Sequence, residues 1–233
     1  MTSVRWGIIS TAKIGMEKVT PAIQAASNCD VVAIASRSPE RASEAAIALG
    51  IPSSFDTYQD LLDAGDIDAV YIPLPNDQHA EWAIRAARAG KHVLCEKPLA
   101  MTEAQAREVV DACAEAGVKL MEAFMYRHHP TWVTAIELVR SGAVGEVQAV
   151  HSWFSYYNDD PSNIRNRLEH GGGATMDIGC YCVNLSRLVF DAEPSTVQAA
   201  VRRDPLLGID TVTSAVLEFP RGGQAVFLSL IHI

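Results

Sequence analysis

The chain has 233 residues, of which 48% are hydrophobic and 20% are charged, a balance typical of a globular protein with a sizeable buried core. Its formal net charge is -9, which disfavours a nucleic-acid partner or an anionic membrane surface. No apolar run approaches the roughly 20 residues that span a bilayer, and the first strand begins too close to Met1 for a signal peptide, so we expect a cytoplasmic protein.

Strands and helices alternate through the first half of the chain. Apolar, β-branched runs predict strands at 4–10, 30–36, 68–76, 91–98 and 118–126. Helices are expected between them, the first from about 13 to 27 with an interruption where Thr20 caps a restart at Pro21. Ser38 and Thr102 are expected to cap two later helices. This alternation predicts a doubly wound parallel sheet over residues 1–125.

The pattern changes after Tyr126. A helix is expected over 130–140, a strand over 145–157, a polar loop to 173 and a second helix over 174–190. Three further strands, at 195–204, 210–219 and 224–231, have the turn signals of antiparallel hairpins. The fold class is therefore α/β, a Rossmann sheet followed by an α+β domain over 126–233 with an antiparallel sheet that is open on one face.

The turn after the first strand reads "GIISTAKIG" and lacks two glycines of the pattern G-x-G-x-x-G, whose places are taken by Ser10 and Ala12. Small side chains still permit a pyrophosphate to approach the helix N-terminus, where backbone N–H groups and the helix dipole favour an anion. The alternative is a tight turn that binds no nucleotide. If it binds one, the cofactor-binding residues here are Ser10, Thr11, Ala12, Lys13, Ile14 and Gly15.

The residues after the second strand distinguish the two nicotinamide cofactors. An NAD site has Asp or Glu there to bind the ribose 2′-hydroxyl, whereas this chain has Ser36, Arg37 and Ser38. An arginine with two serines suits a 2′-phosphate, so these residues predict NADP, although NAD stays possible.

Two further strand ends carry polar loops, and ligands of such sheets bind beyond the carboxyl ends of the strands. "CEKPLA" places Glu96 and Lys97 there, and we expect Glu96 to orient Lys97. The loop "PLPNDQH" adds the cofactor candidates Leu74, Pro75, Asn76 and His79. Asn76 could instead cap the next helix, and His79 could be a surface histidine.

These stretches, with "YIPLPNDQHAEWAIRAARAGKHVLCEKPLA", "MEAFMYRHHP" and "GGGATMDIGCY", resemble the glucose-fructose oxidoreductase/inositol dehydrogenase (Gfo/Idh/MocA) family over the whole chain. The sequence is most similar to its NADP-dependent branch of dihydrodiol and xylose dehydrogenases. The resemblance implies hydride transfer between NADP and a sugar or cyclic diol. A non-catalytic sugar sensor and an NAD-dependent polyol dehydrogenase are the alternatives.

The resemblance also assigns roles to residues. Lys97 matches the lysine that contacts the nicotinamide ribose and the substrate hydroxyl, Tyr181 the acid/base, and Asp177 a substrate-orienting aspartate. Asp177 and Tyr181 are four residues apart and so share a helix face. A tyrosine ionises near pH 10, and a lysine beside it would favour the phenolate.

Further residues around this helix complete the predicted site. The glycines before the helix are expected to admit the substrate, and the polar loop is expected to form a rim with Asn163 and Arg165. By resemblance, Tyr126 lies near the substrate and Arg127 near the cofactor, while His128 is expected to be structural.

The five cysteines lack a CxxC spacing, so we expect reduced thiols and no metal site. Family members usually continue for roughly a further third of this length, so the second domain is expected to be truncated inside a middle strand, and the unfinished sheet is expected to have an unpaired edge. The full-length form is expected to be a homodimer.

Overall fold

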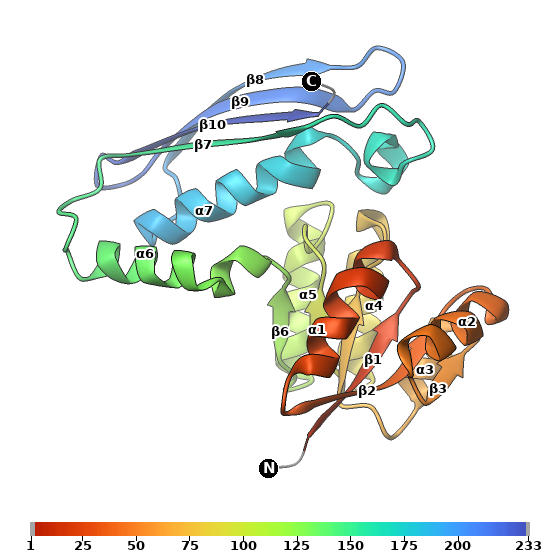
Figure 1. Cartoon of the computed structure of the whole chain (residues 1–233). Coiled ribbons are helices and arrows are strands. Elements are labelled where there is room, and N and C mark those ends of the chain that lie inside the picture. The colour runs from red at the N-terminus through yellow and green to blue at the C-terminus, as the bar shows by residue number, and fades with distance from the viewer. Residues whose placement is uncertain (1–2, 232–233) are drawn as a thin grey trace. The chain divides into compact units, whose positions relative to one another are not determined.

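A computed structural model describes residues 3–231 (Figure 1). The chain divides into two compact units, Met1–Ala123 and Phe124–Ile233. Each unit has its own sheet and its own hydrophobic core, as expected for two domains.

The first unit is a six-stranded parallel sheet in the order β3-β2-β1-β4-β5-β6. This confirms the predicted Rossmann sheet, whose strand order reverses between β1 and β4. The short strand β3 and the helix α3 were not predicted. The strands are β1 Val4–Ile9, β2 Cys29–Ala35, β3 Ser53–Phe55, β4 Ala69–Ile72, β5 His92–Cys95 and β6 Leu120–Glu122.

Helices cover both faces of this sheet. Neighbouring side chains of a strand point to opposite faces, so Ile8 of β1 packs with α1 and α2 while Ile9 packs with α3, α4 and α5. Burial on both faces explains why these strands are apolar without alternation. The side-chain oxygens of Ser38, Thr57 and Thr102 cap the N-termini of α2, α3 and α5. The helices are α1 Thr20–Ala25, α2 Pro39–Leu49, α3 Tyr58–Asp63, α4 Asn76–Arg88 and α5 Glu103–Glu115.

The first helix is continuous from Lys13 to Ala25, so the predicted interruption at Thr20 is wrong. Thr20 has helical dihedral angles and does not act as a cap. A π-helical segment, η1 Gly15–Val19, precedes it, and the Thr20 N–H donates to the carbonyl of Gly15. This wider turn carries the helix past Pro21, whose ring would collide with a carbonyl in a regular α-helix.

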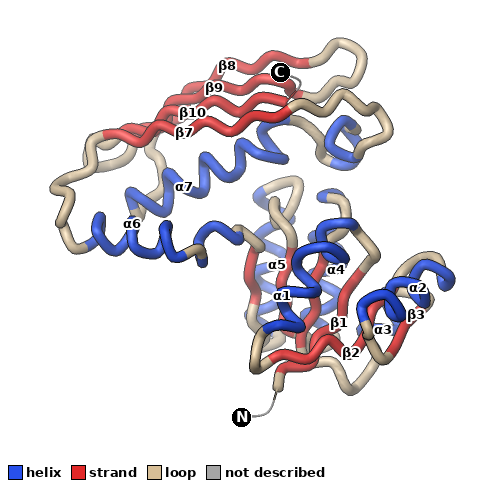
Figure 2. Tube along the Cα trace, viewed as in Figure 1, coloured by secondary structure: helices blue, strands red, loops and turns tan. Residues whose placement is uncertain are grey.

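The second unit contains a four-stranded sheet in the order β7-β10-β9-β8, shown in red in Figure 2. The predicted antiparallel sheet is in fact mixed, because β7 pairs parallel to β10. The chain returns from β7 through a helix rather than a hairpin, and such a crossover makes parallel pairing possible. Its strands are β7 Ala149–Tyr156, β8 Thr196–Arg203, β9 Asp210–Glu218 and β10 Gln224–Ile231.

The last strand, β10, pairs with β7 on one side and β9 on the other. The last strand is therefore a middle strand, as expected, and among the described residues the edges of the sheet are β7 and β8. The turn predicted between β9 and β10 is present, with Gly222 at a φ of 85°.

One face of this sheet is covered by α7 Cys180–Phe190, which Figure 1 shows running along the strands. Alternate residues of β9 and β10, such as Leu217 and Phe227, are buried with Cys182 of α7. The opposite face is more exposed, and Trp153 on it is 70% exposed. One face is thus open, as predicted. The remaining helices are α6 Pro130–Arg140, the short helices η2 Met125–His128, η3 Ile164–Asn166 and η4 Leu168–His170, and the π-helical η5 Thr175–Gly179.

Candidate functional site

The turn after β1 keeps the backbone of a glycine turn without the glycine. Ser10 has a φ of 111°, a value that non-glycine residues rarely adopt. Its hydroxyl donates to the carbonyl of Pro73 at 3.3 Å and accepts the N–H of Ala12 at 3.2 Å. These bonds hold the strained residue in place at the point where the strand order reverses. Of the residues that follow, Lys13 and Ile14 are exposed and Gly15 is buried.

Two substitutions at Ser10 test this strain. Ser10→Ala loses both hydrogen bonds and keeps the unfavourable φ, so we expect a loss of about 1–2 kcal/mol in the free energy of unfolding. Ser10→Gly loses the same bonds and removes the strain of about 1–3 kcal/mol, so it should be the more stable of the two. Chemical denaturation measures both values.

Ser43 provides the matched control, because it is exposed in the middle of α2. Alanine is favoured over glycine by about 1 kcal/mol in a helix interior, so the order of stability should be the reverse of that at Ser10. An alanine variant more stable than the glycine variant at both positions would rule out strain at Ser10.

The three residues after β2 are an arginine, Arg37, between two serines, Ser36 and Ser38. Ser36 is buried, and its hydroxyl accepts the N–H of Ser38 at 3.2 Å. Arg37 is exposed, and its guanidinium interacts with the buried hydroxyl of Tyr58, whose pKa is raised by burial and lowered in part by Arg37. The nearest acid along the chain, Glu40, accepts a hydrogen bond from the Ser38 hydroxyl, which lowers the pKa of Glu40.

The loop after β5 is held from several sides. Glu96 accepts the hydroxyl of Tyr71 at 2.7 Å and the backbone N–H of Lys97 at 3.3 Å. Glu122 accepts the N–H of Leu99 at 2.8 Å. The Lys97–Pro98 peptide is cis. These hydrogen bonds fix the backbone around Lys97 at the carboxyl end of β5. The Lys97 side chain itself is half-buried.

His79 joins the loops that follow β4 and β5. It is fully buried, and its two ring nitrogens lie 2.7 Å from the carbonyl oxygens of Leu74 and Pro98. Burial lowers its pKa, partly offset by these two bonds. The alternative of a surface histidine is wrong, because the ring is enclosed and links the loops after β4 and β5.

Asn76 does not cap α4, which was the alternative to its role in cofactor binding. The helix begins at Asn76 itself, with Pro75 as the preceding residue and no side-chain cap. Asn76 and Pro75 are partly exposed, whereas Leu74 is buried. Asn76 therefore does not act as the cap, and its side chain lies at the carboxyl end of β4.

In the second unit, Asp177 lies in the π-helical η5 and is buried. One carboxylate oxygen accepts the Nε–H of Arg165 at 3.1 Å, and the other accepts the hydroxyl of Tyr156. Burial and the hydrogen bond to Asp177 raise the pKa of Tyr156 well above its usual value. Asp177 and Arg165 are thus brought together, with a partner on β7 that the sequence did not reveal.

The glycines before this helix have a different role from the one predicted. A side chain at Gly172 would strike the backbone carbonyl of Arg165, and one at Gly173 would strike the carboxylate of Asp210. Gly173 also has a φ of 116°. The space is filled by protein, so these glycines fasten the polar loop and Asp210 to the helix rather than admit a substrate.

Tyr181 lies one turn beyond Asp177, at the start of α7, and is partly exposed. Its ring contacts the rings of Phe124, Tyr126 and Phe154 at centroid distances of 5.2, 6.1 and 5.5 Å. Its hydroxyl is 4.0 Å from the sulfur of Met125. An aromatic enclosure with an accessible phenol suits a residue that exchanges a proton with a ligand.

Other predicted residues of this unit have local partners. Tyr126 donates to Asn184 at 2.6 Å, and burial raises the pKa of Tyr126 to about 12. Asn163 accepts the N–H of Arg165 at 3.0 Å and so shapes the loop. Arg127 and His128 are exposed.

Five residues that support the candidate site by hydrogen bonds could not be predicted from the sequence. Each is a single polar side chain in an apolar or mixed segment, and such a residue forms no recognisable motif. Four of them bond to a predicted site residue or to η5, and Glu122 holds the loop after β5 through Leu99. They are Tyr71, Glu122, Tyr156, Asn184 and Asp210.

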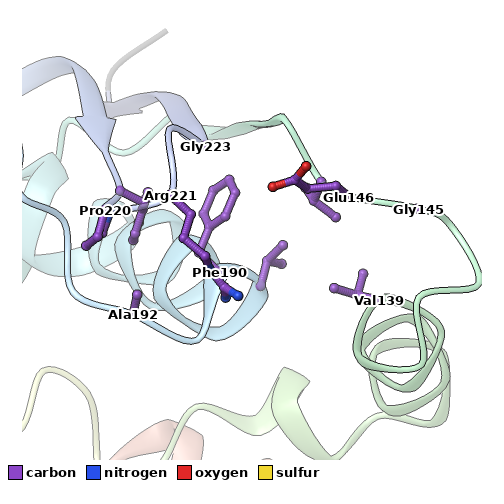
Figure 3. A pocket seen from close by; sticks show the side chains of 11 residues that line it. Val139, Gly145, Glu146, Phe190, Ala192, Pro220, Arg221 and Gly223 are labelled. Carbon is purple, nitrogen blue, oxygen red and sulfur yellow. The ribbon is translucent and has the colours of Figure 1, made fainter.

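A cavity of about 190 Å³ lies at the far end of α7, two turns beyond Tyr181 (Figure 3). Phe190, Pro220 and Arg221 line it together with Glu146, and no predicted site residue does. Within residues 3–231, no group of three or more His, Cys, Asp or Glu side chains is placed to hold a metal ion. In the same described range, no helix has the length and apolarity that crossing a membrane requires.

Known proteins resemble the chain along its whole length. D-xylose 1-dehydrogenase (NADP(+)) 2 of Haloferax volcanii is 47% identical over 94% of this chain and 67% of its own length. Trans-1,2-dihydrobenzene-1,2-diol dehydrogenase of Xenopus laevis is 35% identical over 98% of this chain and 69% of its own length. The chain thus spans about two thirds of the length of these relatives.

Among solved structures, a 3-ketoreductase from Actinomadura kijaniata in complex with NADP and TDP-benzene has a TM-score of 0.91. It is 34% identical and is matched over 100% of this chain and 71% of its own. Variants of that enzyme with a tyrosine changed to phenylalanine and a lysine changed to alanine have also been solved with the same ligands.

Two domain families account for nearly all of the chain. Residues 4–124 match the GFO/IDH/MocA oxidoreductase family with its NAD-binding Rossmann fold, and residues 132–230 match the GFO/IDH/MocA C-terminal domain. The parallel sheet, the strand-end loops and the helix that carries Asp177 and Tyr181 agree with these matches. The chain therefore belongs to the GFO/IDH/MocA family of NAD(P)-dependent oxidoreductases.

Proposed function

We propose that this protein transfers a hydride between NADP and the carbinol or carbonyl carbon of a sugar or cyclic diol. The observation that carries the proposal is the fixed loop at the carboxyl end of β5, where bonds to Glu96, Glu122 and His79 hold the backbone of residues 97–99, because ligands of such sheets bind beyond the strands' carboxyl ends. The named relatives that oxidise D-xylose and a dihydrodiol support this substrate class.

The residues present fit a dinucleotide. Ser10 reproduces the positive φ of a glycine turn, and the helix that follows offers its N-terminal N–H groups to a pyrophosphate. Arg37 and Ser38 would hold the 2′-phosphate, and Leu74, Pro75 and Asn76 would lie along the nicotinamide half. NADP, when bound, supplies or accepts the hydride.

The chain's own groups handle the proton and the orientation of the substrate. Tyr181 takes the hydroxyl proton during oxidation and returns it during reduction. Lys97 binds the substrate hydroxyl from the loop after β5. Tyr126 shapes the aromatic enclosure around Tyr181.

The open face of the second sheet supports a homodimer as the assembled form. Trp153 is 70% and Val216 is 36% exposed on this face, and large exposed apolar groups are typical of interfaces. Size-exclusion chromatography with light scattering tests this proposal, since a monomer at all concentrations contradicts it.

The choice of cofactor depends on Arg37. Arg37→Asp should weaken NADP+ use by about 1.5–3 kcal/mol, the scale of a lost charge-assisted hydrogen bond, because a carboxylate repels the 2′-phosphate. The measurement is kcat/KM for NADP+ and for NAD+. Arg88→Asp makes the same charge change at the exposed carboxyl end of α4 and should leave the NADP+/NAD+ ratio unchanged.

If the ratio of kcat/KM for NADP+ to kcat/KM for NAD+ is equal in wild type and Arg37→Asp, the role of Arg37 is refuted. The function itself is tested by following NADPH absorbance with D-xylose, L-arabinose, D-glucose and trans-dihydrobenzenediol. Turnover of at least one of them is expected. Cofactor binding without any turnover would instead identify a sugar sensor.

A further inference from the structure

Arg165 is fixed at its backbone and at its side chain. Its N–H donates to Asn163 at 3.0 Å, and its carbonyl accepts the N–H of Gly173 at 2.9 Å. No side chain larger than that of glycine fits at Gly172 against this carbonyl. The Nε–H then donates to Asp177 at 3.1 Å. Such preorganisation is typical of a binding residue, because little freedom remains to be lost when a ligand arrives.

The side chains of Arg165 and Asp177 differ in how far solvent and ligands can reach them. The Asp177 side chain is 9% exposed, and both of its oxygens accept hydrogen bonds from Arg165 and Tyr156. The Arg165 side chain is 46% exposed. The ligand-accessible part of the pair is therefore the guanidinium, a group that only donates hydrogen bonds.

The charges around Arg165 do not favour an anion. Its own charge is balanced by Asp177. The other arginine of this loop, Arg167, is likewise paired, with Glu169. A phosphate or carboxylate on the substrate would have to compete with Asp177 for the guanidinium, whereas an uncharged oxygen would gain a hydrogen bond from the pair as it stands.

We propose that Arg165, and not Asp177, is the substrate-binding residue here, and that the substrate is an uncharged sugar or polyol rather than a phosphorylated or nucleotide-linked sugar. Asp177 and Tyr156 are positioning residues that hold the guanidinium and cancel its charge. This inference rests on the proposed function, whose site it deepens.

Arg165→Gln tests the binding role. We expect KM for the best neutral aldose of the panel above to rise about 10- to 100-fold, the worth of a charge-assisted hydrogen bond, with kcat changed less than about threefold. Arg167→Gln is the matched control, since this exposed arginine of the same loop pairs with Glu169 instead. It should leave both constants unchanged. An unchanged KM in Arg165→Gln would overturn the proposal.

Asp177→Asn tests the charge balance, because it keeps the shape and leaves the Arg165 charge uncompensated. The probes are D-xylose with D-xylose 5-phosphate and D-glucose with D-glucose 6-phosphate. Wild type should prefer each parent sugar, and the variant should raise the phosphate-to-parent ratio of kcat/KM at least about tenfold. Structural damage alone would lower both values and leave the ratio unchanged.

The two levels of the proposal fail in different ways. A wild-type preference for the phosphate esters, or an unchanged ratio in Asp177→Asn, contradicts the role of Arg165 while NADP+-dependent turnover persists. Absence of turnover with every neutral and phosphorylated sugar, together with the diol, contradicts the proposed function and this inference with it.

Discussion

Tyr181→Phe is expected to reduce turnover by about 10²–10⁴-fold, the usual contribution of a positioned acid/base. Phenylalanine keeps the ring contacts with Phe124, Tyr126 and Phe154 and removes only the oxygen that carries the proton. Thermal stability and NADP+ affinity, the latter followed by fluorescence, should therefore barely change. The decisive quantity is kcat under conditions where chemistry limits the rate.

Lys97→Met extends this test. It should also lower kcat, and the loss in the double variant should fall far short of the product of the single losses, because the two groups serve one proton transfer. Near-full turnover in Tyr181→Phe would show that another group carries the proton. His129 is the alternative by position, although its Nδ1 accepts the N–H of Thr131 at the start of α6.

Gly173→Ala is expected to destabilise the second unit by at least about 3 kcal/mol. The new methyl group would displace the carboxylate of Asp210, which accepts the N–H and hydroxyl of Thr175 at 2.7 Å and the hydroxyl of Thr213 at 3.0 Å. The φ of 116° adds strain of about 1–3 kcal/mol. Denaturant unfolding measures the loss.

Gly142→Ala separates the two causes. Gly142 also has a positive φ, 74°, but a methyl group there meets nothing within 4 Å. The free energy of unfolding of Gly142→Ala should therefore fall only by the cost of a left-handed backbone, about 1–2 kcal/mol. Equal losses at Gly142 and Gly173 would contradict the role of Asp210 in anchoring the helix that carries Tyr181.

Much of the fold could be predicted because local patterns agree with tertiary packing. The side chains of Ser38 and Thr102 cap α2 and α5 as expected, and the apolar strands form the parallel sheet. The parallel pairing of β7 with β10 could not be predicted, because paired residues such as Ala149 and Gln224 are 75 positions apart (224 − 149) and β7 alternates like a hairpin strand. The π-helical turn before Pro21 depends on packing and not on propensity.

The residues alone indicate the part of the candidate site at strand ends, and the resemblance adds Asp177 and Tyr181. Ser10, Arg37 and Lys97 follow central strands, and the topology brings such positions to one edge of the sheet. The partners of Asp177 could not be found in this way. Tyr156 ends a strand of the second unit, and Arg165 lies in the short helix η3, which is fixed by hydrogen bonds to Asn163 and Gly173.

The central claim is most directly tested by isotope transfer to the cofactor. The best substrate of the panel is prepared with deuterium at its reacting carbinol carbon, which for D-xylose is C1, and is incubated with the protein and NADP+. Mass spectrometry of the recovered cofactor should show NADPH carrying one deuterium, and Tyr181→Phe should yield it about 10²–10⁴-fold more slowly. Unlabelled NADPH, or none with any sugar or diol of the panel, would contradict the account.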